Sequence, residues 1–318
     1  MTAKNIPEFS IIIVGQNVRW LIRQCLESIY NQSFRDFEVV FVDNNSNDGT
    51  KEFIRSYYPE VTLLENKENL GFCAATNQGI EVSKGRFVCT LNCDVILDKD
   101  FLLNIFNGLK GLDRRIGMAT GKILRFDRKR IDSTGIILTR LRRFYDRGSN
   151  ELSDDRYNKP ERVFGPCAAA GVYKKDMLDD LKIDGEYFDR DFFFSVEDID
   201  IAWRANNKGW ECVYLPEAIC YHLRQSRYYK KDFMQYYAFR NRYLMLIKNE
   251  ELNPFIIISF FIYDIPRFFY TVFKNRKIWM AIFEVLVLFP KMLEKRKIIN
   301  RYKKSIIEKS YSQSYLIS

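Results

Sequence analysis

Hydrophobic runs and helical repeats alternate along the first hundred residues of the chain. Four runs are continuous and rich in β-branched and aromatic residues, which is typical of strands buried on both faces. These predicted strands are residues 9–14 (FSIIIV), 37–42 (FEVVFV), 61–64 and 86–91 (RFVCTL). Apolar residues at helical spacing predict helices at residues 20–31, 50–58 and 72–83. Strands that alternate with helices in this way predict βαβ units, a parallel sheet and an α/β fold.

The pattern becomes less regular after the fourth strand. A helix is predicted near residues 100–108, and the basic stretch 111–162 is expected to contain irregular strands and a loop. Residues 165–173 (GPCAAAGVY) are small enough for the backbone to approach a ligand or another strand closely. A helix at residues 199–207 and two short strands around Pro216 complete this region.

Two strongly apolar segments, residues 255–273 and 278–290, lie further along the chain. The first contains Asp264, Pro266 and Arg267, and the second is shorter than the roughly 20 residues that a membrane span needs. Basic clusters follow both segments, which favours helices that lie in the bilayer interface over spanning helices. These clusters are Lys274, Arg276 and Lys277, and Lys291, Lys295, Arg296 and Lys297. The alternative is that both segments are core helices that pack on the rest of the protein.

Charge is unevenly distributed along the chain. The net charge is +9, but residues 223–318 hold 19 Lys and Arg against 7 Asp and Glu, so residues 1–222 are slightly acidic. This distribution does not suit a nucleic-acid groove, and it suggests a tail that meets an anionic membrane surface. The seven cysteines form no CxxC pair, and no apolar segment precedes the first strand. We therefore expect reduced thiols, no signal peptide and a cytoplasmic protein that is peripheral on the cytoplasmic face of a membrane.

Asp43 in FVDNNSNDGT comes directly after a predicted strand, and Asp94 ends the Asn-Cys-Asp segment that terminates another. The carboxyl ends of strands in an open α/β sheet meet at its ligand-binding edge, so both side chains are expected there. Asp43 could accept hydrogen bonds from a nucleobase or a ribose hydroxyl, or it could form an Asx turn. Asp94 could hold a divalent cation such as Mg²⁺ or Mn²⁺, or it could end its strand in a turn.

Three further residues complete the candidate chemistry. Glu197 and Asp198 open a predicted helix, where acids are favoured by capping and by the helix dipole. A carboxylate there could instead act as a general base toward an acceptor hydroxyl. His222, the only histidine, is either an ordinary satisfied residue or a ligand in an anion site with Arg224 and Arg227. In chain order, these acids and the histidine suggest a metal-assisted transferase site for a nucleotide-activated group.

Five segments in order resemble the inverting family 2 glycosyltransferases and, within them, the rhamnosyltransferase-like branch. They are FSIIIVGQN, FVDNNSNDGT, NLGFCAATNQG, LNCDV, and GEYFDRDFFFSVEDIDIAWRANNKGW with the trailing His222. The resemblance implies a GT-A fold, which is a Rossmann-like, mixed and mostly parallel sheet flanked by helices. It implies a catalytic domain at residues 1–227, with a nucleotide-sugar half (about 1–110) and an acceptor half (about 111–227). Residues 228–318 would form a helical, basic and aromatic extension.

The same resemblance implies roles for individual residues. Asp43 would contact the nucleotide base, Asp94 would hold the metal ion, and His222 would bind the metal ion or the diphosphate. Asp198 would be the general base, with Glu197 as the second candidate. Further contacts to the donor are expected from Gly15, Asn17, Asn45, Asn69, Gly71, Asn77 and Asn92.

The implied activity is the transfer of a sugar from a nucleoside-diphosphate donor to a hydroxyl of a glycan or lipid-linked glycan. It would use Mg²⁺ or Mn²⁺ and invert the anomeric centre, and the branch implies rhamnose. The chain departs from the family pattern at Asn92, which replaces the first aspartate of an Asp-x-Asp motif, and at Gln16, where this branch often has an aromatic residue.

Two other functions remain open at this point. A sugar-1-phosphate nucleotidyltransferase usually has a Gly-rich basic loop after the first strand, where this chain has GQNVRW with one glycine. A non-catalytic membrane adaptor on the same scaffold would not need Asp94 and Asp198. If the tail serves the membrane, truncation near Asn249 should release the protein from membranes and leave the donor site intact.

Overall fold

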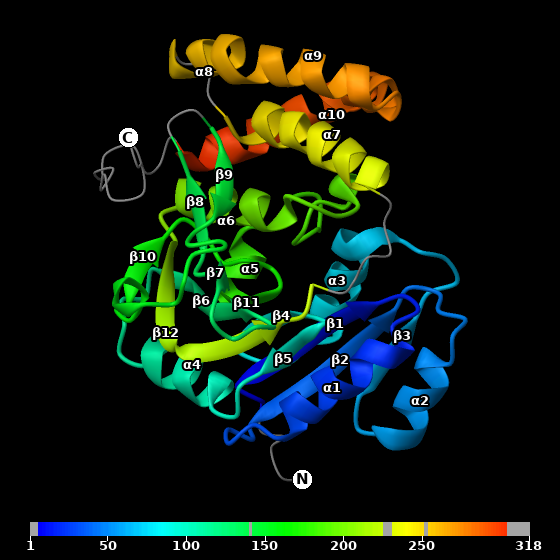
Figure 1. The fold of residues 1–318 in the computed structure, drawn as a ribbon, viewed down its shortest axis with the longest axis vertical. Helices are drawn as coiled ribbons and strands as arrows, with labels where there is room; N and C mark the ends of the chain where they lie inside the picture. Colours follow the sequence, from blue (N-terminus) through cyan, green and yellow to red (C-terminus); the bar gives the residue numbers. More distant parts are fainter. Residues whose placement is uncertain (1–5, 140–141, 225–230, 251–253, 304–318) are drawn as a thin grey trace.

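The computed structural model describes residues 6–139, 142–224, 231–250 and 254–303 (Figure 1). Its main sheet consists of β1 (Phe9–Gly15), β2 (Phe37–Asp43), β3 (Thr62–Glu65), β4 (Phe87–Asn92), β5 (Val95–Leu97), β6 (Ile116–Arg125), β7 (Ile131–Ser133), β10 (Glu161–Val163), β11 (Ala170–Lys174) and β12 (Glu211–His222). The hydrogen-bonded order is β10-β12-β6-β11-β4-β1-β2-β3, with β5 paired to β12 and β7 to β6. Two more strands, β8 (Ile136–Leu138) and β9 (Phe144–Asp146), form a separate antiparallel ribbon.

The first half of the sheet is parallel and follows the predicted pattern. β1 pairs with both β2 and β4, and β2 pairs with β3. The connecting helices are α1 (Arg19–Tyr30), α2 (Thr50–Tyr57) and α3 (Gly71–Val82). In β1, Ile11 and Ile13 belong to the core on the α1 side, and Ile12 belongs to the core on the α3 side. The predicted strands and helices are confirmed here, because a strand covered on both faces needs a continuous apolar run.

Later strands extend the same sheet. β11 runs antiparallel between β4 and β6 and so joins the two halves. β6 and β12 are long parallel neighbours, with a register shift between Leu215 and Ile219. The sequence predicted only irregular strands before residue 162 and two short strands around Pro216. One continuous β12 forms instead, because the irregularity at this shift accommodates Pro216. The helices of this half are α4 (Phe101–Leu109), α5 (Lys175–Asp180) and α6 (Glu197–Asn207), with single 3₁₀ turns at Asp155–Tyr157 and Arg190–Phe192.

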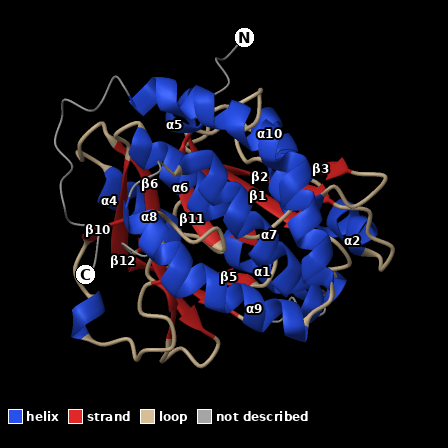
Figure 2. Ribbon diagram, turned by 90° about the horizontal axis from the view of Figure 1, so that it is seen from above, coloured by secondary structure: helices blue, strands red, loops and turns tan. Residues whose placement is uncertain are grey.

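C-terminal helices lie across the molecule above the sheet (Figures 1 and 2). They are α7 (Lys231–Asn249), α8 (Pro254–Ser259), α9 (Ile265–Lys274) and α10 (Lys277–Lys303), with a π-helical turn (Phe260–Asp264) between α8 and α9. α10 extends well beyond the predicted segment 278–290 and contains Pro290 in its interior. Within the described ranges, none of the helices combines the length and the hydropathy that crossing a bilayer requires.

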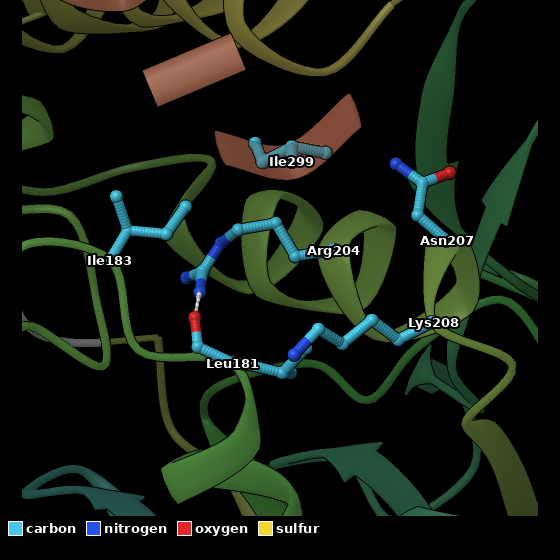
Figure 3. Close-up of a pocket in the computed structure, with 6 residues that line it drawn as sticks. All are labelled: Leu181, Ile183, Arg204, Asn207, Lys208 and Ile299. Atoms are coloured by element: carbon cyan, nitrogen blue, oxygen red, sulfur yellow. Dashed lines mark hydrogen bonds between the residues drawn. The ribbon is translucent and has the colours of Figure 1, made fainter. Parts of the chain in front are cut away.

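α7 and α10 are packed on the α/β part of the molecule. Met245 of α7 and Met292 of α10 belong to the same buried core as the start of α6. In Figure 3, Ile299 of α10 lies over Arg204 of α6, whose Nη1 donates to the carbonyl oxygen of Leu181 at 2.7 Å. The cavity between these residues holds only about 10 Å³, the space of roughly one water molecule. α7 lies before the two apolar segments of the sequence, and α10 buries Ile278, Ala281 and Met292 while it exposes Phe283 and Leu286, so core packing describes only one side of α10.

Candidate active site

A cavity of about 610 Å³ lies between the carboxyl ends of β1 and β4, the start of α6 and the inner side of α7. Seven of the twelve candidate residues line it, although they come from five separate parts of the sequence. These seven are Gly15, Asn69, Asn92, Asp94, Glu197, Asp198 and His222. The structure therefore brings the proposed base and the proposed metal ligands to one cavity.

His222 joins two buried carboxylates. It ends β12 and pairs with Val95 of β5, which places its imidazole beside Asp94. Its Nε2 lies 3.3 Å from Oδ1 of Asp94, and its Nδ1 lies 2.8 Å from Oδ2 of Asp132. Asp132, in β7, is fully buried and also accepts a hydrogen bond from Nε of Arg224 at 2.9 Å. Asp132 therefore fixes the ring so that Nε2 faces Asp94.

The two carboxylates change the protonation of this cluster. Burial lowers the pKa of His222, but the hydrogen bonds to Asp132 and Asp94 outweigh burial and raise the pKa above its usual value. Burial raises the pKa of Asp132, but hydrogen bonds from His222 and Arg224 bring it below its usual value. An imidazole whose second nitrogen is bound by a carboxylate is the arrangement in which histidine commonly ligates metals.

Asp94 and His222 offer a cation two donors. Among the described residues, no group of three or more His, Cys, Asp or Glu side chains could hold a metal ion. Asn92 also lines the cavity, but it offers only a neutral amide oxygen. Mg²⁺ is usually held by one or two carboxylates, with substrate phosphates and water in the other positions. The residues therefore fit a cation that binds together with a diphosphate rather than one that binds to the protein alone.

The acids of α6 follow a strained turn. Phe193, Ser195 and Val196 have φ angles of 65°, 72° and 63°, in the left-handed region. Such a conformation is unusual for a β-branched residue such as Val196, and each strained residue costs about 1–3 kcal/mol. The turn begins α6 so that both Glu197 and Asp198 lie at the helix N-terminus and line the cavity. Strain of this size persists only where the surrounding structure enforces it.

The two acids differ in their partners. Asp198 Oδ2 accepts a hydrogen bond from the N–H of Ala168 at 3.2 Å, and Oδ1 accepts one from the N–H of Ile199 at 2.9 Å. Oε2 of Glu197 has no hydrogen-bond partner among the described residues. Burial raises the pKa of both, and a neighbouring acid raises each further: Asp198 for Glu197, and Asp146 for Asp198. Backbone hydrogen bonds favour the charged form of both acids, but the pKa of Glu197 is raised to about 8 and that of Asp198 to about 6, so Glu197 stays protonated to higher pH.

Asp43 ends β2 beside Gly15, directly behind the cavity wall that Gly15 and Asn44 form. It is fully buried, and its Oδ2 accepts a hydrogen bond from the N–H of Ser46 at 2.8 Å. Its Oδ1 has no partner among the described residues, and the next residue, Asn44, lines the cavity. A buried acceptor without a partner is costly, so a ligand N–H that reached Asp43 would be favoured. Asp43 can therefore stabilise its turn through Oδ2 and still accept a hydrogen bond from a nucleobase through Oδ1.

Two glycines are required by close approach on this side. A Cβ atom at Gly15 would lie 2.7 Å from a neighbouring side chain, and one at Gly71, where φ is 82°, would lie 2.5 Å from the ring of Phe193. Asn69 stabilises the start of α3, because its Oδ1 accepts a hydrogen bond from the N–H of Gly71 at 2.9 Å. Its Nδ2 donates to Gln16 at 2.7 Å, which joins two walls of the cavity.

Asn17, Asn45 and Asn77 do not line the cavity, and neither do Asp43 and Gly71. Oδ1 of Asn17 accepts a hydrogen bond from the N–H of Asn47, in the turn after β2, at 2.8 Å. Asn45 is exposed. The amide of Asn77 makes two hydrogen bonds, of 2.7 and 2.8 Å, to the backbone of Phe188. Asn17 and Asn77 thus hold separate segments together, and the structure places none of the three asparagines at the cavity wall.

Other cavity residues were missed by the sequence reasoning. Asp146, Arg242 and Arg267 line the cavity, and Asp132 orients His222 from behind it. The one available signal was an acid within a short buried strand, as at Asp132 in RIDSTG. Arg227, which was grouped with His222, lies outside the described residues.

Comparison with known proteins gives the family. Residues 10–179 of the 318 match the family model of glycosyl transferase family 2. Glycosyltransferase GlyA of Streptococcus pneumoniae is 24% identical over 185 residues, which are 56% of this chain and 26% of that protein. Poly-beta-1,6-N-acetyl-D-glucosamine synthase of Staphylococcus aureus is 24% identical over 219 residues, which are 67% of this chain and 49% of that protein. The chain thus spans about a quarter to a half of the length of these relatives.

Solved structures are similar over most of the chain. The mannosyltransferase PcManGT from Pyrobaculum calidifontis, in complex with GDP-Man and Mn²⁺, has a TM-score of 0.56 and 18% identity, and the match covers 97% of this chain and 77% of that one. S. aureus TarS 1–349, in complex with UDP-GlcNAc, has a TM-score of 0.58 and 16% identity, with coverages of 96% and 93%. At these identities the likeness shows a shared fold, which confirms the expected GT-A architecture. Because the family model matches more than half of the chain, the chain belongs to glycosyl transferase family 2.

Proposed function

We propose that this chain is an inverting glycosyltransferase. It transfers a sugar from a nucleoside-diphosphate donor to a hydroxyl group of a glycan or lipid-linked glycan. The observation that carries this proposal is the shared cavity, because Asp198 and the Asp94–His222 pair line the same 610 Å³ space. The reaction needs a base at the acceptor and charge neutralisation at the leaving diphosphate. Asp198 would supply the base, and a cation held by Asp94 and His222 would supply the charge.

In this mechanism, Asp198 removes the proton from the acceptor hydroxyl while that oxygen attacks the anomeric carbon. The bond from the anomeric carbon to the diphosphate oxygen breaks as the new one forms, so a single displacement inverts the anomeric centre. The N–H groups of Ala168 and Ile199 hold the Asp198 carboxylate in place before the proton moves. A divalent cation held by Asp94 and His222 would supply the charge that the departing diphosphate needs.

The donor that we propose is deoxythymidine-diphosphate rhamnose, from the resemblance to the rhamnosyltransferase-like branch. Buried Oδ1 of Asp43 suits the imide N–H of thymine or uracil. The test is the release of nucleoside diphosphate from dTDP-rhamnose, UDP-glucose, UDP-GlcNAc and GDP-mannose, each with Mg²⁺ or Mn²⁺. Selective release of dTDP supports the donor. Release from GDP-mannose alone would contradict the proposed contact between Asp43 and a pyrimidine base. No release from any donor would favour the alternative of a non-catalytic membrane adaptor.

The nucleotidyltransferase alternative receives no support from the turn after β1. This turn would have to cradle the phosphates of a nucleoside triphosphate. Its one glycine, Gly15, is enclosed by side chains, and the guanidinium of Arg19 lies 3.8 Å from the centre of the Phe53 ring. Arg19 is therefore engaged by packing on the body of the domain. Incubation with a sugar-1-phosphate and a nucleoside triphosphate is expected to yield no pyrophosphate.

Replacing Asp94 with alanine is expected to remove the cation dependence of nucleotide binding. Loss of an outer-shell partner of a metal site already costs about 10- to 100-fold in affinity, so loss of a direct ligand should cost at least as much. The measurement is calorimetry of UDP and dTDP with and without Mn²⁺, and His222→Ala should show a smaller loss. Asp98→Ala, four residues along, is the control and should bind as the wild type does. Equal affinity of the wild type with and without Mn²⁺ would contradict the metal assignment.

The C-terminal helices expose many large apolar side chains, and we propose that these meet an anionic membrane surface at the cytoplasmic face. On α8, the π-helical turn and α9 they are Ile257, Ile258, Phe260, Phe261, Ile262, Phe269, Tyr270 and Phe273, and on α10 they are Trp279, Met280, Phe283, Leu286, Val287 and Phe289. Lys274, Arg276 and Lys277 are exposed at the turn between α9 and α10. Exposed apolar surface of this extent commonly marks an interaction site. Two residues of the second basic cluster serve the fold instead, since Lys291 and Lys295 form ion pairs with Asp191 and Asp189.

Replacing Phe273 and Trp279 together with glutamate is expected to abolish flotation with vesicles that contain anionic phosphatidylglycerol. The change removes two exposed aromatic anchors and adds repulsion beside basic residues that each contribute about 1 kcal/mol at such a surface. Tyr57→Glu is the matched control, because Tyr57 is an exposed aromatic residue on α2, far from α9 in Figure 1. If the wild-type protein fails to float at low salt, the membrane proposal is wrong.

A further inference from the structure

The turn before α6 does not keep its shape through its own residues. Phe193, Ser195 and Val196 occupy left-handed conformations, although none of them is glycine. Val196 is the N-cap residue of α6 and provides no side-chain hydrogen bond to it. A turn of this kind requires groups from elsewhere in the fold to hold it. The groups that hold it therefore decide where Asp198 points.

Asn241, on α7, holds this turn. Its Nδ2 donates to the carbonyl oxygens of Phe192 at 2.8 Å, Phe194 at 2.7 Å and Ser195 at 3.0 Å. Asn241 is fully buried, and its Oδ1 accepts a hydrogen bond from Nη1 of Arg240 at 2.7 Å. The Arg240 contact orients the amide so that its N–H groups face the turn. One side chain thus binds three carbonyl groups of the strained segment.

The donor side of the fold holds the same turn. The carbonyl oxygen of Phe193 accepts a hydrogen bond from the N–H of Cys73 at 3.1 Å, at the start of α3. The ring of Phe193 lies in the space that Gly71 leaves free, and it stacks on Tyr237 of α7 with the ring centres 5.3 Å apart. The turn is therefore enclosed between α3 and α7.

Buried ion pairs hold the segment on both sides of the turn. Nζ of Lys248 lies 2.7 Å from Asp189, before the turn, and 2.8 Å from Asp200, after it. Nζ of Lys295, on α10, lies 2.6 Å from Asp189. The flanks of the segment are thus anchored by lysines, and Asn241 contacts the turn between them.

We propose that Asn241 is a positioning residue for the general base. By binding the carbonyl groups of the turn, it makes α6 begin where Asp198 is directed into the cavity. This proposal rests on the proposed function, because it takes Asp198 as the base. Asn241 does not line the cavity, so it acts through the turn and not on a substrate. α7 then contributes to the reaction as well as to the packing of the C-terminal helices.

The test compares two variants of Asn241 with the full-length protein. Asn241→Asp keeps the volume but replaces the donating Nδ2 with an oxygen that faces three carbonyl oxygens. Its kcat for release of nucleoside diphosphate should fall by about 10- to 100-fold, the effect of a slightly misplaced catalytic group. KM for the donor and the binding of UDP with Mn²⁺ should stay nearly unchanged. Amides of residues 193–200 should exchange hydrogen for deuterium faster than in the wild type. Asn241→Ala avoids the buried charge and should show the same split if Asn241→Asp does not fold.

Asn275→Ala is the matched control. Asn275 is also buried, and its Nδ2 donates to a carbonyl oxygen at the opposite end of α7, that of Asp232, at 3.0 Å. Its loss should lower the melting temperature but leave kcat and the exchange of residues 193–200 unchanged. If the folded Asn241 variants keep the wild-type kcat, or if they lose kcat and UDP affinity together, Asn241 has only a structural role and the proposal is wrong.

Asp198→Asn in the same assay separates this proposal from the proposed function. If Asp198→Asn remains active, the base assignment itself is wrong. If Asp198→Asn is inactive while the folded Asn241 variants are fully active, only the positioning role fails.

Discussion

Replacing Asp198 with asparagine is expected to lower the rate of sugar transfer by about 10²–10⁴-fold, the usual contribution of a general base. Asparagine keeps the size of the side chain but cannot take a proton from the acceptor hydroxyl. The affinity for the donor nucleotide should stay nearly unchanged, because Asp198 lies at the start of α6, whereas the proposed nucleotide contacts lie at the ends of β1 and β2. The measurements are single-turnover transfer and calorimetry of the nucleoside diphosphate.

Glu197→Gln is the matched control for that variant. Burial raises the pKa of Glu197, and the neighbouring Asp198 raises it further, so glutamine resembles the protonated form that the wild type already has. Its rate should therefore stay within about tenfold of the wild type. If Asp198→Asn keeps more than a tenth of the activity and Glu197→Gln does not, the two roles are exchanged. The pH profile of the transfer rate is a further check. Asp198 can accept a proton only when it is ionised, and its pKa is raised, so the rate should fall as the pH drops through that raised pKa.

Replacing Lys248 with methionine is expected to reduce the free energy of unfolding by at most about 3–5 kcal/mol. It removes one cation from each of two buried carboxylates, and Asp189 keeps Lys295 while Asp200 keeps Arg204. Lys248 is only 1% exposed and lies within 2.8 Å of both Asp189 and Asp200. The measurement is urea unfolding at neutral pH. Lys297→Met is the control, because Lys297 forms only an exposed ion pair with Glu294 and should cost at most about 1 kcal/mol. Equal losses in the two variants would mean that the buried network does not stabilise the fold.

The same network revises the expectation for truncation near Asn249. Such a truncation keeps α7 but removes α10, and with it Lys295, whose Nζ lies 2.6 Å from Asp189 and 2.7 Å from Asp191. The segment that leads to α6 would lose Lys291 and Lys295, two of the three lysines that pair with Asp189 and Asp191, and would keep Lys248. A truncated chain therefore tests folding before it tests membrane binding, which is why the membrane test above uses surface substitutions in the complete chain.

The sequence was most informative where local pattern determines structure. The bounds of β1, β2 and β4 lie within a residue of the predicted ones, because each is a buried strand with an uninterrupted apolar run. β6 was missed because its buried positions include Thr120 and Lys122, which do not resemble core residues. Lys122 is tolerated there because its Nζ donates to Asn158 at 2.7 Å, a contact that no local pattern reveals.

The tail shows the same limit. Its apolar segments were correctly recognised, but hydropathy alone did not distinguish the side that packs on the body from the side that is exposed. Met292 and Lys295 of α10 are buried, whereas Phe283 and Leu286 of the same helix are exposed. The partners that bury Lys295 are acids about a hundred residues earlier in the chain.

By itself, the sequence determined the α/β class, the strand ends that carry Asp43 and Asp94, and the acids that open α6. These follow from short-range rules, because periodicity reports burial and a strand end reports which edge of the sheet a residue occupies. Only the tertiary structure decided that Asp132 orients His222 and that Asn241 holds the turn before Asp198. These contacts join residues 90 and 47 positions apart. Hydrogen bonds between such distant segments depend on how the whole chain packs, and no local pattern in one sequence encodes them.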